Sequence, residues 1–491
     1  MIQTNRTIRA LPNFRMLTDG QVEELTLAAF EIVEKVGLKV LHDGARKMLA
    51  DAGARLDGEI VRVPEHIVRD CLAKAPRGWA IYDRKGNKAL DLRGRNSYYG
   101  TSTASPTTKD ALTGEYHKTG VQDLERGAHI ADALENIDWV MPMGSVQDVP
   151  SIAAELHEFA ATVTHTTKPI VFLSYSPRGM ALVYDMAQEV AGGADALTEK
   201  PFLVSYPEPI TPLVMPAETV DRIFVAADRY LPQMMGPAVQ LGATGPVTIP
   251  AAVAQGIAES MLCIVIAQLR APGCPVGLGC SYAAFDMQRG LMSVGGPEMS
   301  LAQAAHAEVA QSFGLPTWGL AGATDAKVLD AQAGVEATFH IMAQGLSGLN
   351  LIHDVGYMDM SMACSVEQLV LGDEIIGMVR RFMRGLEFSA DQLALDVIQK
   401  VGPGGQYLSE MHTMKHFRKE LWQTSLFTRK PIEKWQADGC RTTEDRVRER
   451  VAHLLETHTP EKLPESVIES LERIKTEVEA ELVATTKENA A

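Results

Sequence analysis

Cysteine and positive charge are both scarce in this sequence. Its 491 residues contain six cysteines without regular spacing, so they do not predict a disulfide framework, and we expect a reduced, cytoplasmic setting. Lysine and arginine number 46 against 62 aspartate and glutamate residues, which gives a formal net charge of −16. A chain this acidic, with no long basic run, should repel a phosphate backbone. Nucleic acid is therefore not expected as a partner.

Targeting segments and long apolar runs are also missing. The N-terminus, MIQTNRTIRALPNFRMLTDG, has no apolar stretch of the kind found in a signal peptide. No uninterrupted apolar run is long enough to cross a bilayer. With 46% hydrophobic and 22% charged residues, the composition is typical of a globular protein with a sizeable core. We expect neither export by a signal peptide nor a membrane span.

Several common catalytic motifs are absent. No G-x-G-x-x-G follows a predicted strand and no G-x-x-x-x-G-K-[ST] occurs, which disfavours NAD and ATP as ligands. No G-x-S-x-G is present, so a serine nucleophile on a sharp turn is not expected. Cys274 and Cys280 bracket one predicted strand and would lie about 20 Å apart, too far to share a zinc ion. We expect no metal site.

Short apolar runs that end in small or polar residues alternate with segments of helical period from residue 98 onward. This alternation indicates β-α units and a parallel sheet. Eight such runs can be counted, and they start at residues 98, 139, 170, 202, 233, 275, 316 and 349. Eight strands, each followed by a helix, predict a (β/α)₈ TIM barrel.

The barrel is predicted to have helical extensions at both ends. Residues 1–97 mix amphipathic helices with short extended pieces and are expected to form a cap. Residues 98–386 form the predicted barrel. Residues 387–491 are again helical and end in an acidic, heptad-like tail, ESVIESLERIKTEVEAEL. That tail is either a pairing surface or a solvated surface helix, and we expect a homo-oligomer.

Residues at the carboxyl ends of barrel strands form the active sites of TIM barrels, so these positions are candidate site residues. Tyrosines and carboxylates are concentrated there, although aromatics make up only 6% of the chain. The candidates for substrate binding are Tyr98, Tyr99, Tyr206, Glu208, Gln240, Tyr282, Asp286, His353, Asp354 and Tyr357. Further polar or large residues at strand ends are Met143, Tyr175, Phe285, Asp325 and Lys327.

Tyrosines and carboxylates that converge on one pocket suit a small cation. A quaternary ammonium offers no N–H group, so it must be held by aromatic faces and negative charge. The alternative is that each tyrosine packs under a loop with its hydroxyl in water. For the group as a whole we favour a cation cage.

Two of the candidates have open roles. Lys327 could form a Schiff base with a substrate, or it could form an ion pair with Asp325 or Asp330. His353 could be a structural histidine, or it could donate a hydrogen bond to a substrate carboxylate while Asp354 orients its other nitrogen.

Long blocks of the sequence resemble the trimethylamine/glycine betaine methyltransferase family. They are residues 241–316, beginning LGATGPVTIPAAVAQG, residues 322–385, beginning GATDAKVLDAQAG, and the segment EMHTMKHFRKELW near the end. The resemblance implies a barrel enzyme that moves a methyl group from a methylated amine to the Co(I) of a separate corrinoid protein. No corrinoid would then be bound by this chain itself.

Members of that family that act on trimethylamine carry pyrrolysine, whereas this chain has only the twenty standard residues. It therefore resembles the branch without pyrrolysine, which acts on quaternary amines such as glycine betaine. The strong nucleophile is supplied by the partner, so no catalytic side chain is expected, and the enzyme works by orientation and electrostatics. His353 would then face the betaine carboxylate and Tyr357 its methyl groups.

Two other functions compete with this interpretation. One is a TIM-barrel lyase or aldolase that uses Lys327. The other is a betaine-binding protein without catalytic activity.

Overall fold

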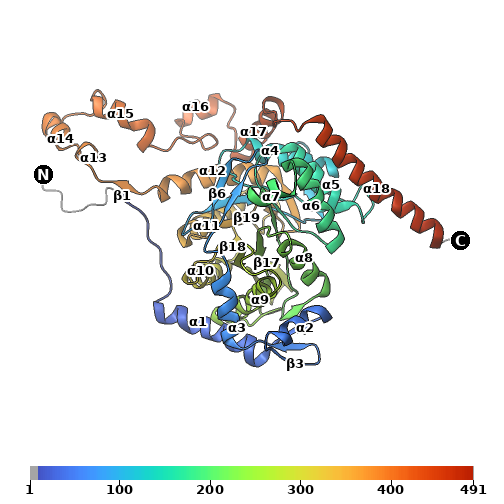
Figure 1. Ribbon diagram of the computed structural model, residues 1–491. Coiled ribbons are helices and arrows are strands. Elements are labelled where there is room, and N and C mark those ends of the chain that lie inside the picture. Colours follow the sequence, from blue (N-terminus) through green and yellow to red (C-terminus); the bar gives the residue numbers. More distant parts are fainter. Residues whose placement is uncertain (1–8, 490–491) are drawn as a thin grey trace.

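A closed barrel of parallel strands lies at the centre of the computed structural model, which describes residues 9–489, with side chains up to residue 481 (Figure 1). Seven strands run in the order β10, β11, β13, β15, β18, β19, β7, with every neighbouring pair parallel. Their bounds are Ile170–Phe172, Leu203–Ser205, Gln233–Met235, Val276–Gly279, Thr317–Leu320, Leu351–Val355 and Tyr98–Thr101.

The eighth strand is reduced to two residues. Trp139 forms a parallel bridge with Gly100 of β7, and Val140 forms a parallel bridge with Ile170 of β10. These bridges join the two ends of the seven-stranded sheet and close the barrel. The predicted TIM barrel is confirmed, with seven regular strands and two bridged residues at the position of the second predicted strand.

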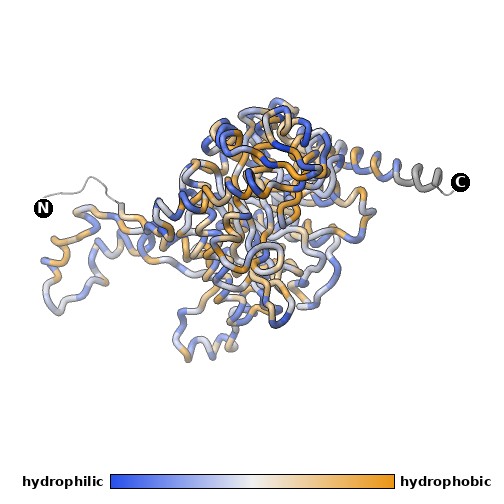
Figure 2. Tube along the Cα trace, turned by 90° about the horizontal axis from the view of Figure 1, so that it is seen from below, coloured by the Kyte–Doolittle hydropathy of each residue, from blue (hydrophilic) through white to orange (hydrophobic). Residues whose placement is uncertain are grey.

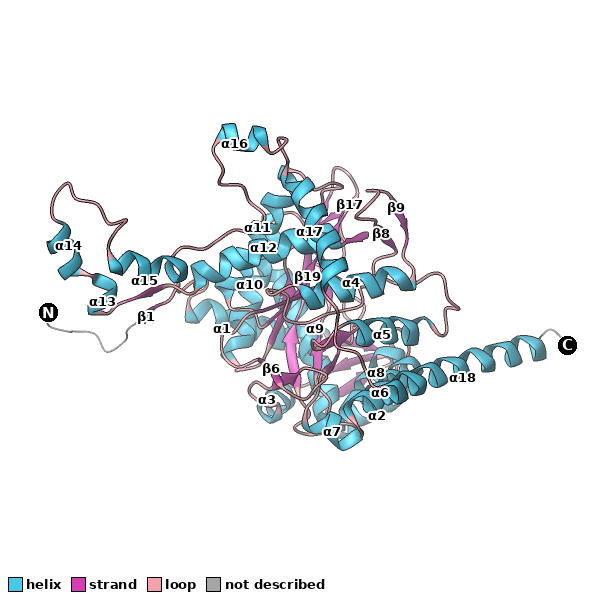
Figure 3. Cartoon of the chain, turned by 90° about the horizontal axis from the view of Figure 1, so that it is seen from above, coloured by secondary structure: helices cyan, strands magenta, loops and turns pink. Residues whose placement is uncertain are grey.

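The helices that follow the strands surround the barrel (Figure 3). They are α4 (Val121–Ala133), α5 (Ala154–His165), α6 (Pro177–Ala191), α8 (Ala217–Ala227), α9 (Ile249–Arg270), α10 (Pro297–Ser312), α11 (Ala331–Ser347) and α12 (Val366–Met383). A shorter helix, α7 (Ala194–Glu199), precedes β11. By length and composition α9 could cross a membrane, but 83% of its apolar window is buried inside the protein. It is a core helix here.

Capping residues define where α11 begins and ends. The Asp330 carboxylate accepts hydrogen bonds from the backbone N–H groups of Gln332 and Ala333 and so begins α11. The helix ends at Gly348, whose φ of 69° lies in the left-handed region that glycine adopts without strain. This short exit returns the chain directly to the barrel, where β19 follows.

The N-terminal region covers one side of the barrel and closes its amino end. Helices α1 (Asp19–Glu31) and α3 (Glu65–Lys74) pack on α9. The hairpin of β5 (Ala80–Tyr82) and β6 (Lys88–Asp91) buries Ile81 and Leu90 in one apolar cluster with residues from the barrel interior. The remaining elements there are η1 (Ile32–Val36), α2 (Asp43–Asp51) and a sheet of β12, β2, β4 and β3 (Val214–Met215, Leu38–Val40, Ile60–Arg62 and Arg55–Asp57).

The C-terminal region has a part that packs on the barrel and a part that projects from it. Helix α17 (Thr443–Thr457) packs on α12 and α4, and α18 (Glu465–Asn489) packs on α5 and α6. Leu471 and Val478 of α18 are buried in that contact. The apolar face of the heptad-like tail is therefore covered by its own chain. Figures 2 and 3 show the other part, with α13 (Ala390–Leu393), α14 (Leu395–Val401) and α15 (Met411–Glu420), extending away from the barrel.

Two small sheets frame the carboxyl end of the barrel. One contains β20 (Tyr357–Met358), β21 (Ala363–Ser365), β8 (Thr107–Lys109) and β9 (Tyr116–Lys118). The other contains β14 (Ala238–Leu241), β16 (Ser281–Asp286) and β17 (Leu291–Ser293). Both are built from chain that follows barrel strands, so they extend the barrel wall around its mouth.

Candidate active site

A cavity of about 240 Å³ opens at the mouth of the barrel, inside the two small sheets. Drug-sized ligands occupy pockets of about 300–1,000 Å³, so this cavity suits a smaller molecule. It is lined by Thr103, Ala104, Leu173, Tyr206, Glu208, Ala238, Val239, Gln240, Ser281, Tyr282, Ala283, Met292, Val294, Leu320, His353, Asp354, Tyr357 and Ser361. Seven of the ten residues predicted from the sequence are among them.

Tyr206 and Glu208 come from the chain directly after β11, and alternation along an extended segment turns both toward the barrel axis. The Tyr206 ring lies close to the backbone of Gly236, where a Cβ atom would be only 2.0 Å from the ring. The ring fits because residue 236 has no side chain. The Tyr206 hydroxyl lies within reach of the Glu208 carboxylate and of the Gly236 carbonyl, 3.3 Å away.

His353 and Asp354 are neighbours on β19, yet both line the cavity. In a regular strand, consecutive side chains point to opposite faces. Asp354 has a φ of 78°, and the pairing of β19 with β7 shifts register between Ile352 and Val355. This irregularity turns the second side chain to the same side as the first, as a β-bulge does.

The His353 ring is fixed by stacking. Its centroid lies 4.2 Å from that of Trp318, with 23° between the two planes, and Tyr206 packs on the same indole at 4.6 Å. His353 Nε2 lies 3.3 Å from the Ser281 hydroxyl. The orientation of the imidazole is therefore set by aromatic contacts beneath the cavity.

The other ring nitrogen of His353 lies next to Asp354. Nδ1 and Oδ1 are 2.5 Å apart, but their alignment does not make a hydrogen bond, and both atoms are buried without another partner among the described residues. Buried polar atoms without partners are rare in folded proteins and call for an explanation.

Three of the residues around the cavity have backbone conformations that side chains disfavour. Ala104, Asp354 and Ser361 have φ values of 51°, 78° and 68°. Positive φ is uncommon for residues other than glycine, and such strain gathers at functional sites. Backbone strain is therefore concentrated at this cavity.

The charged groups around the cavity are acidic. Among the described residues, those that line it include Glu208 and Asp354 but no lysine or arginine. Burial raises the pKa of Glu208 above that of a free carboxyl group, and the Tyr206 hydroxyl opposes this by its hydrogen bond. Burial likewise keeps the pKa of Tyr357 well above its usual value, so its hydroxyl stays neutral. The cavity can offer negative charge and aromatic surface.

Three of the predicted site residues lie outside the cavity, which corrects the expectation that they belong to it. Tyr98 and Tyr99 begin β7 rather than end it. The Tyr98 hydroxyl accepts a hydrogen bond from the backbone of Asp91, and the Tyr99 hydroxyl donates one to the carbonyl of Ile341. Asp286 lies at the exposed end of β16, where it pairs with Arg289 at 2.7 Å.

Two residues that do line the cavity have polar contacts elsewhere. The Tyr282 hydroxyl lies 3.0 Å from Nδ1 of His306, so its polar contact is with α10. The Gln240 amide lies 3.5 Å from the sulfur of Met292 and remains half exposed at the rim.

Lys327 is exposed and does not belong to the cavity. Its ammonium group lies 3.2 Å from Asp359 and donates to the carbonyl of Asp325 at 2.7 Å. The ion pair is therefore made with Asp359 rather than with Asp325 or Asp330. The geometry gives no support to a Schiff base on Lys327.

The cavity and its surroundings do not form a metal centre. Among the described residues, no group of three histidine, cysteine, aspartate or glutamate side chains could hold a metal ion. Cys274 and Cys280 are both buried, and burial raises the pKa of each thiol. Neither thiol is disposed to act as a thiolate.

Some residues that line the cavity or support its lining were not expected from the sequence. Trp318 lies inside β18 rather than at its end, so a search of strand ends misses the ring that fixes His353. Ser281 and Met292 belong to the mouth sheet of β14, β16 and β17, which extends beyond the barrel strands. A signal for that sheet was available in the apolar run that continues past the predicted sixth strand.

The trimethylamine methyltransferase (MTTB) family profile matches residues 2–481. The chain belongs to the trimethylamine methyltransferase family. It is 30% identical over 466 residues to trimethylamine methyltransferase MttB of Desulfitobacterium hafniense strain DSM 10664 / DCB-2, covering 94% of each chain. It is also 30% identical over 455 residues to a glycine betaine methyltransferase of Desulfitobacterium hafniense strain Y51, covering 92% of this chain and 95% of that protein. The protein is thus a methyl-transferring enzyme, and the predicted family is confirmed.

Solved structures support the fold of this family member. The monomethylamine methyltransferase MtmB of Methanosarcina barkeri superposes with a TM-score of 0.53 at 13% sequence identity. The superposition covers 90% of this chain and 89% of that structure. At this level of identity the similarity concerns the fold alone.

Proposed function

We propose that this methyltransferase transfers a methyl group from a quaternary amine, glycine betaine or a related betaine, to the Co(I) of a separate corrinoid protein. The observation that carries the proposal is the small cavity at the barrel mouth, lined by tyrosine rings and two carboxylates. The two relatives described above are named for different amines, so the choice of substrate rests on the chemistry of the cavity.

The cavity suits a cation that has no N–H donor. A quaternary ammonium ion spreads its charge over its methyl groups, and aromatic faces and carboxylates attract such an ion. Tyr206 and Tyr357 supply rings, and Glu208 and Asp354 supply negative charge. Removing these groups from bulk water strengthens the attraction.

A betaine also carries a carboxylate, which needs hydrogen-bond donors in so acidic a cavity. Ser281, Gln240 and His353 have polar atoms at or near the surface of the cavity. We assign the carboxylate to this side, with His353 donating from Nε2 and Asp354 opposite Nδ1. The ammonium end then lies toward Tyr357 and Glu208.

The quaternary nitrogen makes a nucleophilic side chain unnecessary. The amine departs neutral because the substrate already carries the positive charge, and the corrinoid supplies the attacking electron pair. This chain's residues hold the cation, aim one methyl group toward the mouth and exclude water. Orientation and electrostatics are recognised sources of catalysis.

The rim of the barrel fits a protein partner that carries the methyl acceptor. Each of the eight loops that follow the barrel strands exposes a large apolar side chain. They are Leu112, Ile152, Tyr175, Ile210, Val247, Met287, Val328 and Met362. Exposed apolar residues around a functional opening are typical of an interaction site.

Methyl transfer to free cob(I)alamin tests the substrate, and transfer to a corrinoid protein tests the rim. With glycine betaine or another quaternary amine we expect the absorbance of cob(I)alamin to fall as the methylated form appears. Trimethylamine should give no transfer. Activity with trimethylamine alone would refute the assignment of a quaternary substrate, and binding without transfer would indicate a betaine-binding protein.

Variants at the rim distinguish docking of the corrinoid protein from the methyl transfer itself. Met287→Asp and Leu112→Asp should slow transfer to a corrinoid protein while leaving transfer to free cob(I)alamin unchanged. Both side chains are more than 60% exposed, so the changes should not disturb folding. Equal slowing with both acceptors would place these residues in the substrate site instead.

A further inference from the structure

The segment of residues 386–421, which we call the arm, carries an unusual amount of exposed apolar surface. It contains β22 (Leu386–Glu387) and α13, α14 and α15. Eleven large apolar side chains of the arm are exposed: Leu386, Phe388, Leu393, Leu395, Ile398, Tyr407, Leu408, Met411, Met414, Phe417 and Leu421. Leu408 and Met411 are 81% and 78% exposed. Soluble monomers rarely expose so many apolar residues together.

Some of the charged groups of the arm pair with one another. Lys400 lies 2.7 Å from Glu410, and Lys415 lies 2.7 Å from Asp391. These two pairs neutralise four charged side chains of the arm, and the eleven apolar side chains remain exposed beside them. Helices as short as those of the arm are marginal in water without packing, so the arm requires a surface to cover it.

The arm is held away from the barrel of its own chain. Glu420 near its end forms ion pairs with Arg381 and Arg384 of the α12 terminus, each at 3.2 Å. At its start, β22 pairs with β1 (Arg9–Ala10). Figure 1 shows the helices between these two attachments standing clear of the barrel.

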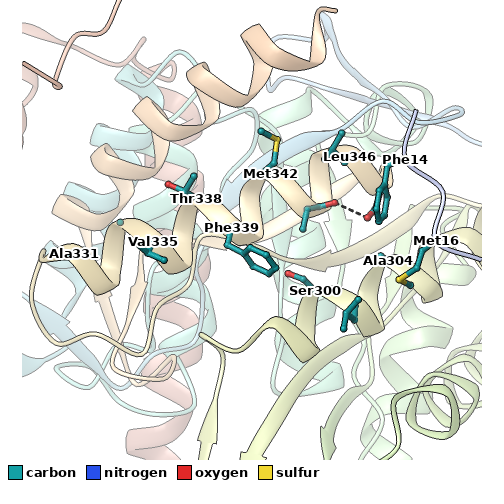
Figure 4. A pocket seen from close by; sticks show the side chains of 14 residues that line it. Phe14, Met16, Ser300, Ala304, Ala331, Val335, Thr338, Phe339, Met342 and Leu346 are labelled. Atoms are coloured by element: carbon teal, nitrogen blue, oxygen red, sulfur yellow. Dashed lines mark hydrogen bonds between the residues drawn. The ribbon is translucent and has the colours of Figure 1, made fainter. Parts of the chain in front are cut away.

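A groove on the same flank of the barrel lacks a cover. It has a volume of about 900 Å³ and lies between α10 and α11, with Phe14 and Met16 at one end (Figure 4). Val335 and Phe339 project from α11 along it and are 68% and 49% exposed. A second apolar hollow of about 500 Å³ between α1 and α9 shares Met16 with this groove and so extends it.

We propose that the arm of one chain packs into the α10–α11 groove of a second copy of the same chain. Both surfaces are apolar, both lie on one flank, and the arm's attachments keep it off its own groove. A reciprocal pair would bury two arms and two grooves about a twofold axis, the commonest symmetry of soluble oligomers. A stable interface needs about 800 Å² from each partner, which a whole arm of helices can supply.

Sedimentation velocity and light scattering on the full-length protein test this contact. The parent should be an oligomer at micromolar concentration. An arm variant, Leu408→Asp with Met411→Asp, and a groove variant, Val335→Asp with Phe339→Asp, should each associate at least tenfold more weakly. Leu56→Asp, a change of the same kind at a 45% exposed site in the N-terminal sheet, should leave the oligomer intact.

Mixing the two variants distinguishes contact between chains from contact within one chain. The arm variant keeps an intact groove and the groove variant keeps an intact arm, so a mixed pair regains one contact. We expect the mixture to associate more tightly than either variant alone, with circular dichroism and amine binding unchanged throughout. A monomeric parent, an oligomer that survives the arm variant, or a mixture that behaves like its components would each overturn the proposal. None of these outcomes depends on the substrate.

Discussion

Replacing Glu208 with glutamine removes one negative charge from the cavity without changing the size of the side chain. If the cavity binds a quaternary ammonium ion, that charge stabilises the bound cation. Methyl groups surround the nitrogen, so it approaches a carboxylate oxygen no closer than about 4–5 Å. At an effective dielectric constant of about 20, one such pair is worth roughly 3–4 kcal/mol. Water at the open rim reduces this, and we expect a loss of about 1–2 kcal/mol, or roughly five- to thirtyfold in Kd.

Isothermal titration calorimetry with choline and 3,3-dimethylbutan-1-ol measures this effect, because the two ligands differ in charge but hardly in shape. Glu208→Gln should weaken choline binding and leave the neutral alcohol unaffected. Asp286→Asn is the matched control, since it changes the net charge equally at a residue outside the cavity. Equal losses for both ligands would mean that Glu208 shapes the cavity but does not attract a cation.

The parent and the Glu208→Gln variant should also differ in how their affinity for choline depends on pH. Burial raises the pKa of Glu208, so this carboxyl takes up its proton at a higher pH than a free carboxyl group does. Choline keeps its charge at every pH, so its affinity for the parent should be highest above that raised pKa and fall as pH falls through it. Glu208→Gln should remove this dependence. An identical pH profile in parent and variant would assign the titration to another group.

Three further changes test other parts of the structure. His353→Ala should cost glycine betaine about 1.5–3 kcal/mol of binding free energy and leave tetramethylammonium nearly unaffected, because only the betaine carboxylate needs the donor; calorimetry would show equal losses if His353 is structural. Tyr357→Ala should weaken quaternary amine binding by about 1–2 kcal/mol, while Tyr98→Ala, outside the cavity, should bind normally; the reverse order would place the aromatic cage elsewhere. Glu367→Ala should lower the free energy of unfolding by about 3–5 kcal/mol, since it leaves buried Lys109 without its partner; a chemical-denaturation midpoint equal to that of the parent would contradict this.

The barrel was predictable because its signal is repeated. Each strand leaves an apolar run and each helix an amphipathic segment, so eight weak signals support one another. The second strand shows the limit of this reasoning. The run at Trp139 was expected to form a strand like the others, but it contributes only two bridges, since Pro142 cannot donate to a sheet and ends the pairing.

Some of the cavity residues could be predicted from the positions of the strands, and others were predicted wrongly. Tyr206 and Glu208 directly follow β11, and His353 lies two residues before the end of β19, so they meet at the barrel mouth. Tyr98 and Tyr99 were placed there wrongly because a short run does not reveal at which residue its strand begins and ends. The strand begins at these tyrosines, and its carboxyl end is Thr101.

Other features depend on contacts that no local pattern encodes. The stacking of Trp318 on His353 joins two strands through the barrel interior. The shifted register that turns Asp354 into the cavity arises where β19 meets β7, a strand from the far earlier part of the chain. Such contacts follow from the closed barrel and cannot be read from either strand alone.

The left-handed backbone at Asp354 limits how this site can diversify among related proteins. Aspartate, asparagine and glycine tolerate that conformation, whereas a β-branched or aromatic residue would lose about 1–2 kcal/mol there. Gln240 belongs to the extended strand β14, where replacing the side chain alters the cavity without straining the backbone. We therefore expect related proteins to differ in amine preference through substitutions at Gln240. Position 354 should be restricted to a few small residues.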